Sequence, residues 1–437
     1  MTGIALLLTL SSGGGRIGQK PCAAAMYEFP AVRVACGARI EPHKGRVALR
    51  ETVASRLSVL LFGWLLQLAT ISSAQSQPNG RAPEIAITPA PGRPFIEMRG
   101  DQQHINFDLL VRTGGQRVYR LVCIRLRVYD RSGGLEIERE LNENGKPPAL
   151  DMVGDRLLQP GSVMDIYQPF DSFGPEVDAS MMRFELLFME QEHAAPPVVI
   201  NADAIAMIEV HPRSYSPTAY CLPLHGLILV HDGHDFYSHH RRYGLANRFE
   251  VHPSSAVSAN LYAYDFMAAT PDGALFRGDA TKKESWLAYG TMIFAPASGQ
   301  VVDAVSDVPE NTFAVNGDAQ VPSTTGSKDP MGFGNHVTIR HEDGRVSWLL
   351  HMQPNSVQVK AGDQVKAGQF LGRIGFSGDS LFPHLHFNVT DGAMYPSQGV
   401  PSYFKHFVRI LGRRKVSIVF GQVDTGDLIM DATRPCR

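Results

Sequence analysis

Short stretches in which apolar and polar residues alternate recur between residues 85 and 212. This two-residue period is that of a β-strand, whose successive side chains point to opposite faces. Turn formers such as Ser132-Gly133-Gly134 separate the stretches. Several short strands at this spacing predict an immunoglobulin-like β-sandwich over 85–212, acting as a spacer, a docking module or a packing scaffold. The clearest strands are His104–Val111, Tyr119–Tyr129 and Met182–Phe188.

The second half of the chain continues the short strands, now divided by glycine turns. One apolar stretch, Phe382–Asn388, contains an H-x-H pattern. A strand places His384 and His386 on one face, roughly 6.5 Å apart, with Leu385 and Phe387 facing a core. Such a pair can hold one metal and one reacting group. The alternative is that both are simply polar residues on the solvent-exposed face of a half-buried strand. The segments before it are Tyr289–Val302, Gly332–His341, Trp348–Met352 and Val357–Gly372.

In this order the segments resemble the lysostaphin/LytM-type zinc metallopeptidases, which cut peptide cross-links in bacterial peptidoglycan. The resemblance covers roughly residues 225–395 and rests on the H-x-H, an upstream His and the glycine frame. It implies an antiparallel β-sheet metallopeptidase domain over 214–400. The tail over 401–437 is expected to pack on this domain as a C-terminal extension. The predicted fold class is therefore all-β, with the immunoglobulin-like sandwich preceding the peptidase domain.

The resemblance also implies a zinc site. Catalytic zinc usually takes three protein ligands and leaves one position open. His386 matches the second His of the H-x-H, and Asp265 matches the Asp of an earlier motif. The family's H-x-x-x-D spacing would place the remaining His at position 261, where Leu261 stands. A longer loop must therefore deliver it.

His252 is the nearest histidine in sequence and is the predicted third ligand. His240 or His239, next to two arginines, is the alternative, and a defective site without a third ligand is a further one. His351 and His384 match the family's non-ligand histidines, which orient or deprotonate water and stabilise the oxyanion. Imidazole suits these roles because its pKa lies near neutrality.

The predicted function is a zinc-dependent endopeptidase that hydrolyses peptide bonds of peptidoglycan cross-links or stem peptides. Zn²⁺ is the expected cofactor, lowering the pKa of the attacking water and polarising the carbonyl. The alternative is a catalytically inactive domain of the same fold that binds cell wall or activates an amidase. A lipoyl carrier is disfavoured because it has no place for the H-x-H strand. The net charge of −2 offers no basic field for nucleic acid.

The N-terminal region has the pattern of a secretory signal. Basic residues up to Arg56 precede an apolar run over 57–69, and Ser72-Ser73-Ala74 follows as a cleavage site. We therefore expect residues 1–74 to be a non-mature leader with its signal peptide at about 56–74, and 75–84 to be a linker. The apolar run is shorter than the ~20 residues that span a bilayer, so no stable span is expected in the mature form. The predicted location is periplasmic or secreted, with an uncleaved anchor as the alternative and Met26 as a possible start.

Three of the five cysteines follow the leader. An oxidising compartment permits a disulfide. Cys221 and Cys436 bracket the predicted peptidase domain, so we predict that they pair. Cys123 lies inside a predicted strand and is expected to be a buried free thiol.

Overall fold

The computed structural model describes residues 84–170, 172–191, 202–236, 238–242, 257–323, 325, 329, 331–393 and 397–432. All of these residues fall in one compact unit, Ser76–Arg437. Strands dominate them, which confirms the predicted all-β fold class. Short 3-10 helices occur at Ala149–Met152 (η1), His240–Arg242 (η2) and Lys283–Ser285 (η3). The predicted leader lies outside the described residues. Within the described part, no helix combines the length and apolar character needed to cross a bilayer.

Two sheets in the N-terminal half share one hydrophobic core, in which Phe107 and Phe184 meet edge to face. The first sheet has the order β1-β4-β8 and the second β11-β10-β5-β6, with β7 beside β5. The predicted strand at Tyr119–Tyr129 is β5, whereas the single strand predicted over 104–111 is divided between β3 and β4. The immunoglobulin-like connectivity stays a prediction. The strands are β1 (Ile85–Ala90), β4 (Asp108–Thr113), β5 (Tyr119–Tyr129), β6 (Leu135–Asn142), β7 (Leu157–Leu158), β8 (Met164–Tyr167), β10 (Met181–Glu190) and β11 (Ala204–Val210).

A smaller sheet in the same half has the order β12-β2-β3-β9. Its short strand β12 pairs in parallel with β2. Phe95 of β2 packs with the core of the C-terminal half, so this sheet contributes to two cores. The strands are β2 (Phe95–Arg99), β3 (Gln102–Ile105), β9 (Ser172–Phe173) and β12 (Arg213–Ser214).

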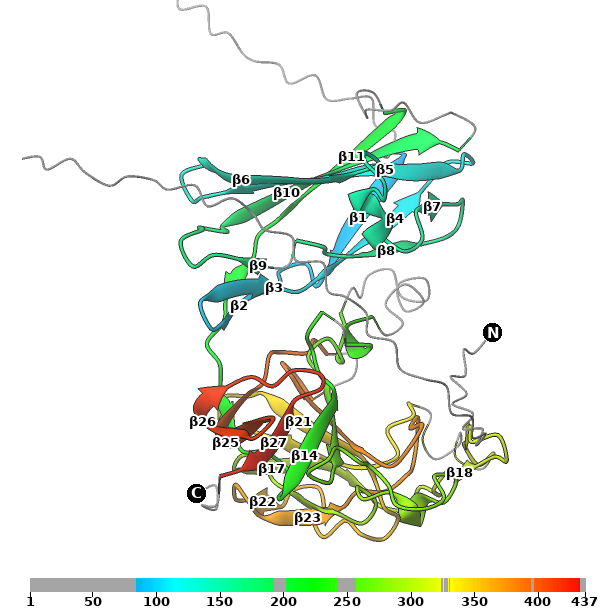
Figure 1. Ribbon diagram of the computed structural model, residues 1–437, viewed down its shortest axis with the longest axis vertical. Coiled ribbons are helices and arrows are strands. Elements are labelled where there is room, and N and C mark those ends of the chain that lie inside the picture. Colours follow the sequence, from blue (N-terminus) through cyan, green and yellow to red (C-terminus); the bar gives the residue numbers. More distant parts are fainter. Residues whose placement is uncertain are drawn as a thin grey trace, which may run out of the picture. The chain divides into compact units, whose positions relative to one another are not determined.

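The C-terminal half is built on one long sheet with the order β13-β25-β27-β14-β15-β24-β21-β20-β17-β22, and β26 pairs with β25. In Figure 1 the red strand β27 lies next to green β14, with β25 on its other side, so the end of the chain contributes strands to the same sheet as the H-x-H. The strands are β13 (Ala219–Tyr220), β14 (Leu227–Asp232), β15 (Tyr264–Ala268), β17 (Gly299–Val305), β20 (Asn335–Arg340), β21 (Val346–Met352), β22 (Gln364–Val365), β24 (Leu385–Thr390), β25 (Tyr403–Leu411), β26 (Arg414–Gly421) and β27 (Leu428–Asp431).

Two short strand pairs accompany this sheet. The pair β16–β23 packs Ile293 and Leu371 into the main core. The pair β18–β19 lies within the polar stretch over 306–330. The strands are β16 (Met292–Phe294), β18 (Thr312–Phe313), β19 (Ala319–Gln320) and β23 (Phe370–Arg373).

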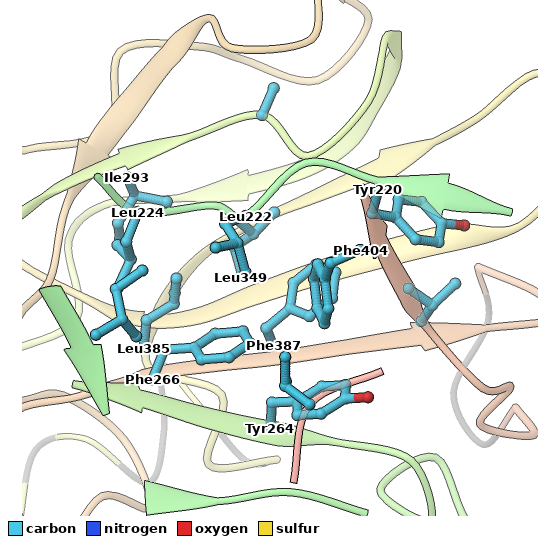
Figure 2. Close-up of a cluster of buried hydrophobic side chains, with 14 of the residues drawn as sticks. Tyr220, Leu222, Leu224, Tyr264, Phe266, Ile293, Leu349, Leu385, Phe387 and Phe404 are labelled. Carbon is cyan, nitrogen blue, oxygen red and sulfur yellow. The ribbon is translucent and has the colours of Figure 1, made fainter. Parts of the chain in front are cut away.

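The core of the C-terminal half explains the direction of the H-x-H histidines. Leu385 and Phe387 of β24 are fully buried with Leu349 of β21 and Phe266 of β15 (Figure 2). Because side chains alternate along a strand, His386 must leave β24 on the opposite face. The predicted division of this strand into a core face and a histidine face is confirmed.

The cysteines agree with the prediction as far as they are described. Cys123 is a buried free thiol, as expected. Cys221 is buried next to Tyr220. Cys436 lies outside the described residues, so the Cys221–Cys436 pairing stays a prediction.

Candidate metal centre and active site

Strand register brings the candidate residues together. Asp265 of β15 is directly opposite His386 of β24, and His386 is opposite Leu350 of β21. On the other side, Asp265 is opposite Asp232, the last residue of β14. Residues directly opposite one another in antiparallel strands have closely spaced side chains. Four neighbouring strands therefore converge on one point, although their residues are far apart in sequence.

The carboxylate of Asp265 is the centre of the cluster. Its Oδ1 atom lies 3.2 Å from Nε2 of His384, 3.3 Å from Nδ1 of His386 and 3.4 Å from Nε2 of His240. Asp265 is only 4% exposed. Three imidazoles surround one buried carboxylate oxygen. Polar residues that merely face solvent on a strand would not converge in this way.

The structure places the predicted residues as follows. His386, Asp265, His384 and His351 lie in one pocket, which apolar Met331, Leu381 and Phe382 also line. His252 lies outside the described residues. His240, the alternative ligand, is carried into the pocket by η2. The neighbouring His239 has a 61% exposed side chain at the rim.

Hydrogen bonds fix the tautomers of the two histidines without a predicted ligand role. Nδ1 of His351 is 2.8 Å from the carbonyl oxygen of Ser377, and Nδ1 of His384 is 2.8 Å from that of Phe382. A carbonyl oxygen only accepts, so Nδ1 carries the proton in both rings. Nε2 of each ring therefore remains for chemistry in the pocket. The two ring centroids are 4.9 Å apart.

The surroundings push the pKa values of these two histidines apart. Burial lowers the pKa of His351 well below its ordinary value, and the charges of His384 and His386 act in the same direction. Burial alone would also lower the pKa of His384, but the Asp265 carboxylate outweighs it and raises that pKa. Burial thus favours the neutral form of His351, and the Asp265 carboxylate favours the charged form of His384, a difference that suits acid–base chemistry.

The surroundings of Asp265 and His386, the two ligand candidates on strands, favour the charge state in which each residue binds a metal. Burial would raise the pKa of Asp265, but the charges of His384 and His240 outweigh it and hold that pKa well below its ordinary range. Burial lowers the pKa of His386 to about 4. A carboxylate and a neutral imidazole are the forms that bind metals.

The donor set fits a zinc ion. The ligand atoms of His240, Asp265 and His386 all lie within 4.8 Å of one another, and all three residues are buried. Oδ1 of Asp265 and Nε2 of His386 are buried without a hydrogen-bond partner among the described residues. Buried polar atoms normally have such partners, so atoms left over at one point suggest a bound group. Two imidazoles and one carboxylate are a common catalytic zinc set.

Asp232 is a residue of this site that the sequence argument missed. Its Oδ2 atom lies 2.7 Å from Nδ1 of His240 and 2.9 Å from Nδ1 of His239. The available signal was a carboxylate directly at the end of the apolar strand Leu227–Val230. Without the pairing of β14 with β15, nothing in the sequence connects it to Asp265.

Comparisons with known proteins find relatives of the C-terminal half of this chain. The model of peptidase family M23 matches residues 286–397, a range that includes His351, His384 and His386. The chain is 31% identical over 126 residues to the cell division protein DipM of Caulobacter vibrioides, covering 28% of this chain and 20% of DipM. It is 44% identical over 57 residues to the glycyl-glycine endopeptidase ALE-1 of Staphylococcus capitis, covering 13% of this chain and 15% of ALE-1.

A third relative is the peptidoglycan DD-endopeptidase ShyC of Vibrio cholerae, 43% identical over 54 residues and covering 12% of each chain. Among solved structures, the catalytic domain of lysostaphin from Staphylococcus simulans is 26% identical, with 32% of this chain and 74% of that chain covered at a TM-score of 0.20. The matched segments span a fifth or less of these curated relatives. The predicted resemblance to lysostaphin- and LytM-type peptidases is confirmed, and residues 286–397 are similar to peptidase family M23.

Proposed function

We propose that this chain is a zinc-dependent endopeptidase that hydrolyses peptide bonds of bacterial peptidoglycan, in cross-links or stem peptides, in the periplasm or outside the cell. The observation that carries the proposal is the convergence of the buried residues His240, Asp265 and His386 in one pocket beside two further histidines. Its relatives ALE-1, a glycyl-glycine endopeptidase, and ShyC, a peptidoglycan DD-endopeptidase, support the choice of substrate.

Nε2 of His240, Oδ1 of Asp265 and a ring nitrogen of His386 would hold the ion, because the ligand atoms of these residues all lie within 4.8 Å of one another. His240 thereby takes the role that the sequence argument gave to His252. Three protein ligands leave a position open for reacting groups. Zinc, when bound, supplies Lewis acidity that polarises a peptide carbonyl.

The two remaining histidines divide the proton transfers. His351 is neutral with its proton on Nδ1, so its Nε2 lone pair can take a proton from the attacking water. His384 donates from Nδ1 to a backbone carbonyl, and its Nε2 proton can bond the oxyanion that forms on the substrate. The apolar side chains of Leu381 and Phe382 at the pocket reduce the water around both rings.

The test compares zinc content and peptidoglycan hydrolysis in the wild-type protein and single variants. We expect His240→Ala and His386→Ala to lose both zinc and hydrolysis, since each leaves two protein ligands. His252→Ala is the matched control and should keep both. Loss of zinc in His252→Ala with full zinc in His240→Ala would return the ligand role to His252. If wild-type protein binds no zinc and hydrolyses nothing even when zinc is supplied, the enzyme hypothesis is wrong. A wall-binding or amidase-activating domain would then be the better explanation.

A further inference from the structure

His240 does not lie on a strand of the sheet, so strand pairing does not fix its position and another group must do so. In the H-x-x-x-D pattern the ligand and the Asp are close in sequence. Here position 261 is a fully buried leucine, and His240 sits on the three-residue 3-10 helix η2. Such a short helix has little stability of its own, so other groups must fix the imidazole.

We propose that Asp232 is the positioning residue for His240. The proposal rests on the metal site proposed above. Asp232 ends β14 opposite Asp265, and the pairing of the two strands is irregular at this point. The irregularity places a second buried carboxylate behind the ligand cluster, where Asp232 is 5% exposed.

The carboxylate of Asp232 binds the whole turn that carries His240. Its Oδ2 atom accepts from the Ser238 hydroxyl at 2.9 Å and from the His240 amide at 3.2 Å. Its Oδ1 atom accepts from the His239 amide at 3.2 Å. Three donors of one turn therefore converge on a single side chain of the neighbouring strand.

The same carboxylate also orients the ring of His240. Nδ1 of His240 lies 2.7 Å from Oδ2 of Asp232, while Nε2 faces Asp265. The negative charge of this carboxylate favours a proton on the nearby Nδ1, and that tautomer leaves the lone pair on Nε2, the nitrogen on the metal side. A carboxylate behind a histidine ligand fixes its tautomer and orientation and raises its basicity, and removing it typically costs 10- to 100-fold in metal affinity.

The experiment uses the full chain with Asp232→Asn and, as matched control, Asp235→Asn. Both carboxylates are buried in the same segment, but that of Asp235 accepts from the amide of Thr425 at 2.6 Å. Asparagine keeps only one acceptor oxygen, so it cannot accept from the donors of the 238–240 turn and also face Nδ1 of His240. We expect zinc affinity, measured by competition with a chelating dye, to fall by about 10- to 100-fold in Asp232→Asn and to stay unchanged in Asp235→Asn.

Two measurements on zinc-free protein test positioning directly. The histidine ¹⁵N spectrum, with the His240 signal assigned through His240→Ala, should show the proton on Nδ1 in wild type and a changed tautomer in Asp232→Asn. Amide hydrogen exchange in the segment 238–240 should be faster in this variant. If Asp232→Asn does not fold, Asp232→Glu takes its place, with weaker zinc binding again expected.

The outcomes separate this proposal from the proposed function. Wild-type zinc affinity and tautomer in the Asp232 variant would overturn the positioning role while leaving the metal site intact. An equal loss of affinity in Asp235→Asn would also overturn it. Wild-type protein that binds no zinc would instead refute the proposed function, and the tautomer and exchange results would then show whether Asp232 holds the turn.

Discussion

His351 has a backbone conformation that is unfavourable for any residue with a side chain. Its φ is +65°, in the left-handed region that favours glycine. Its amide donates to the carbonyl of Phe333 at 3.2 Å, and its own carbonyl accepts from Gly375 at 3.0 Å. Such a conformation costs about 1–3 kcal/mol and persists where its surroundings impose it. The imposed backbone holds the imidazole in the pocket, as the proposed role of His351 as a general base requires.

Replacing His351 by Asn should therefore remove the base with little harm to the fold. Asn tolerates the left-handed region better than most residues. We expect turnover on peptidoglycan to fall by about 10²–10⁴-fold, the usual contribution of a positioned base, while zinc content is kept. Zinc analysis beside the activity assay checks both. Because His351, His384 and His386 also form a possible ligand group, loss of zinc in His351→Asn would point to that group instead.

At the scale of the element, strand β24 connects the core to the site. Phe387 is fully buried against the rings of Phe266 and Phe404 (Figure 2). Its neighbour His386 leaves the other face toward Asp265. Packing on one face of the strand therefore sets the position of the proposed ligand His386 on the other.

The variant Phe387→Ala should destabilise the fold by about 3–5 kcal/mol, the usual cost of removing a buried phenylalanine ring. Chemical denaturation of zinc-free protein measures this cost without a contribution from metal binding. Leu381→Ala is the control, because Leu381 is 69% exposed at the pocket rim and should change stability by less than about 0.5 kcal/mol. Equal stability of the two variants would contradict the core role of Phe387.

Individual elements also show how much of the fold and of the site could be predicted from the sequence. The two-residue period predicts the faces of His384 and His386, and the family resemblance predicts Asp265, because both signals are local. The strand at Tyr119–Tyr129 was likewise visible from its own alternation. His240 and Asp232 could not be assigned in this way, since their roles depend on the pairing of β14 with β15 and on a turn outside the strands. Spacing in sequence does not encode such contacts.

At the scale of the whole molecule, a buried polar network joins β2 of the N-terminal half to the C-terminal half. Glu97 is fully buried and accepts from the side-chain amides of Asn106 at 3.0 Å and Gln422 at 2.6 Å. His234 Nε2 lies 3.3 Å from the same carboxylate. Burial would raise the pKa of Glu97. The nearby His234 is the strongest opposing influence, and the pKa is held below the ordinary 4.5.

This network gives stability a predictable dependence on pH. Because the pKa of Glu97 is depressed in the folded protein, its carboxylate stabilises the fold fully above pH 4.5, and this stabilisation is lost as the pH falls through the lower, folded pKa. Glu97→Gln turns one acceptor oxygen into a donor facing other donors, which should cost about 1–3 kcal/mol near pH 7.

Urea denaturation of zinc-free wild type and Glu97→Gln, across the range from neutral to acidic pH, tests this dependence. The difference in unfolding free energy should be constant at neutral pH and should shrink below pH 4.5, where the wild-type carboxylate becomes protonated. Glu209→Gln serves as the control, because Glu209 has a 47% exposed side chain in a surface pair with Arg183, and such pairs contribute about 0–1 kcal/mol. A gap between wild type and Glu97→Gln that widened with acid would mean that Glu97 is buried in its neutral form, and the two halves would then be joined by hydrogen bonds without charge.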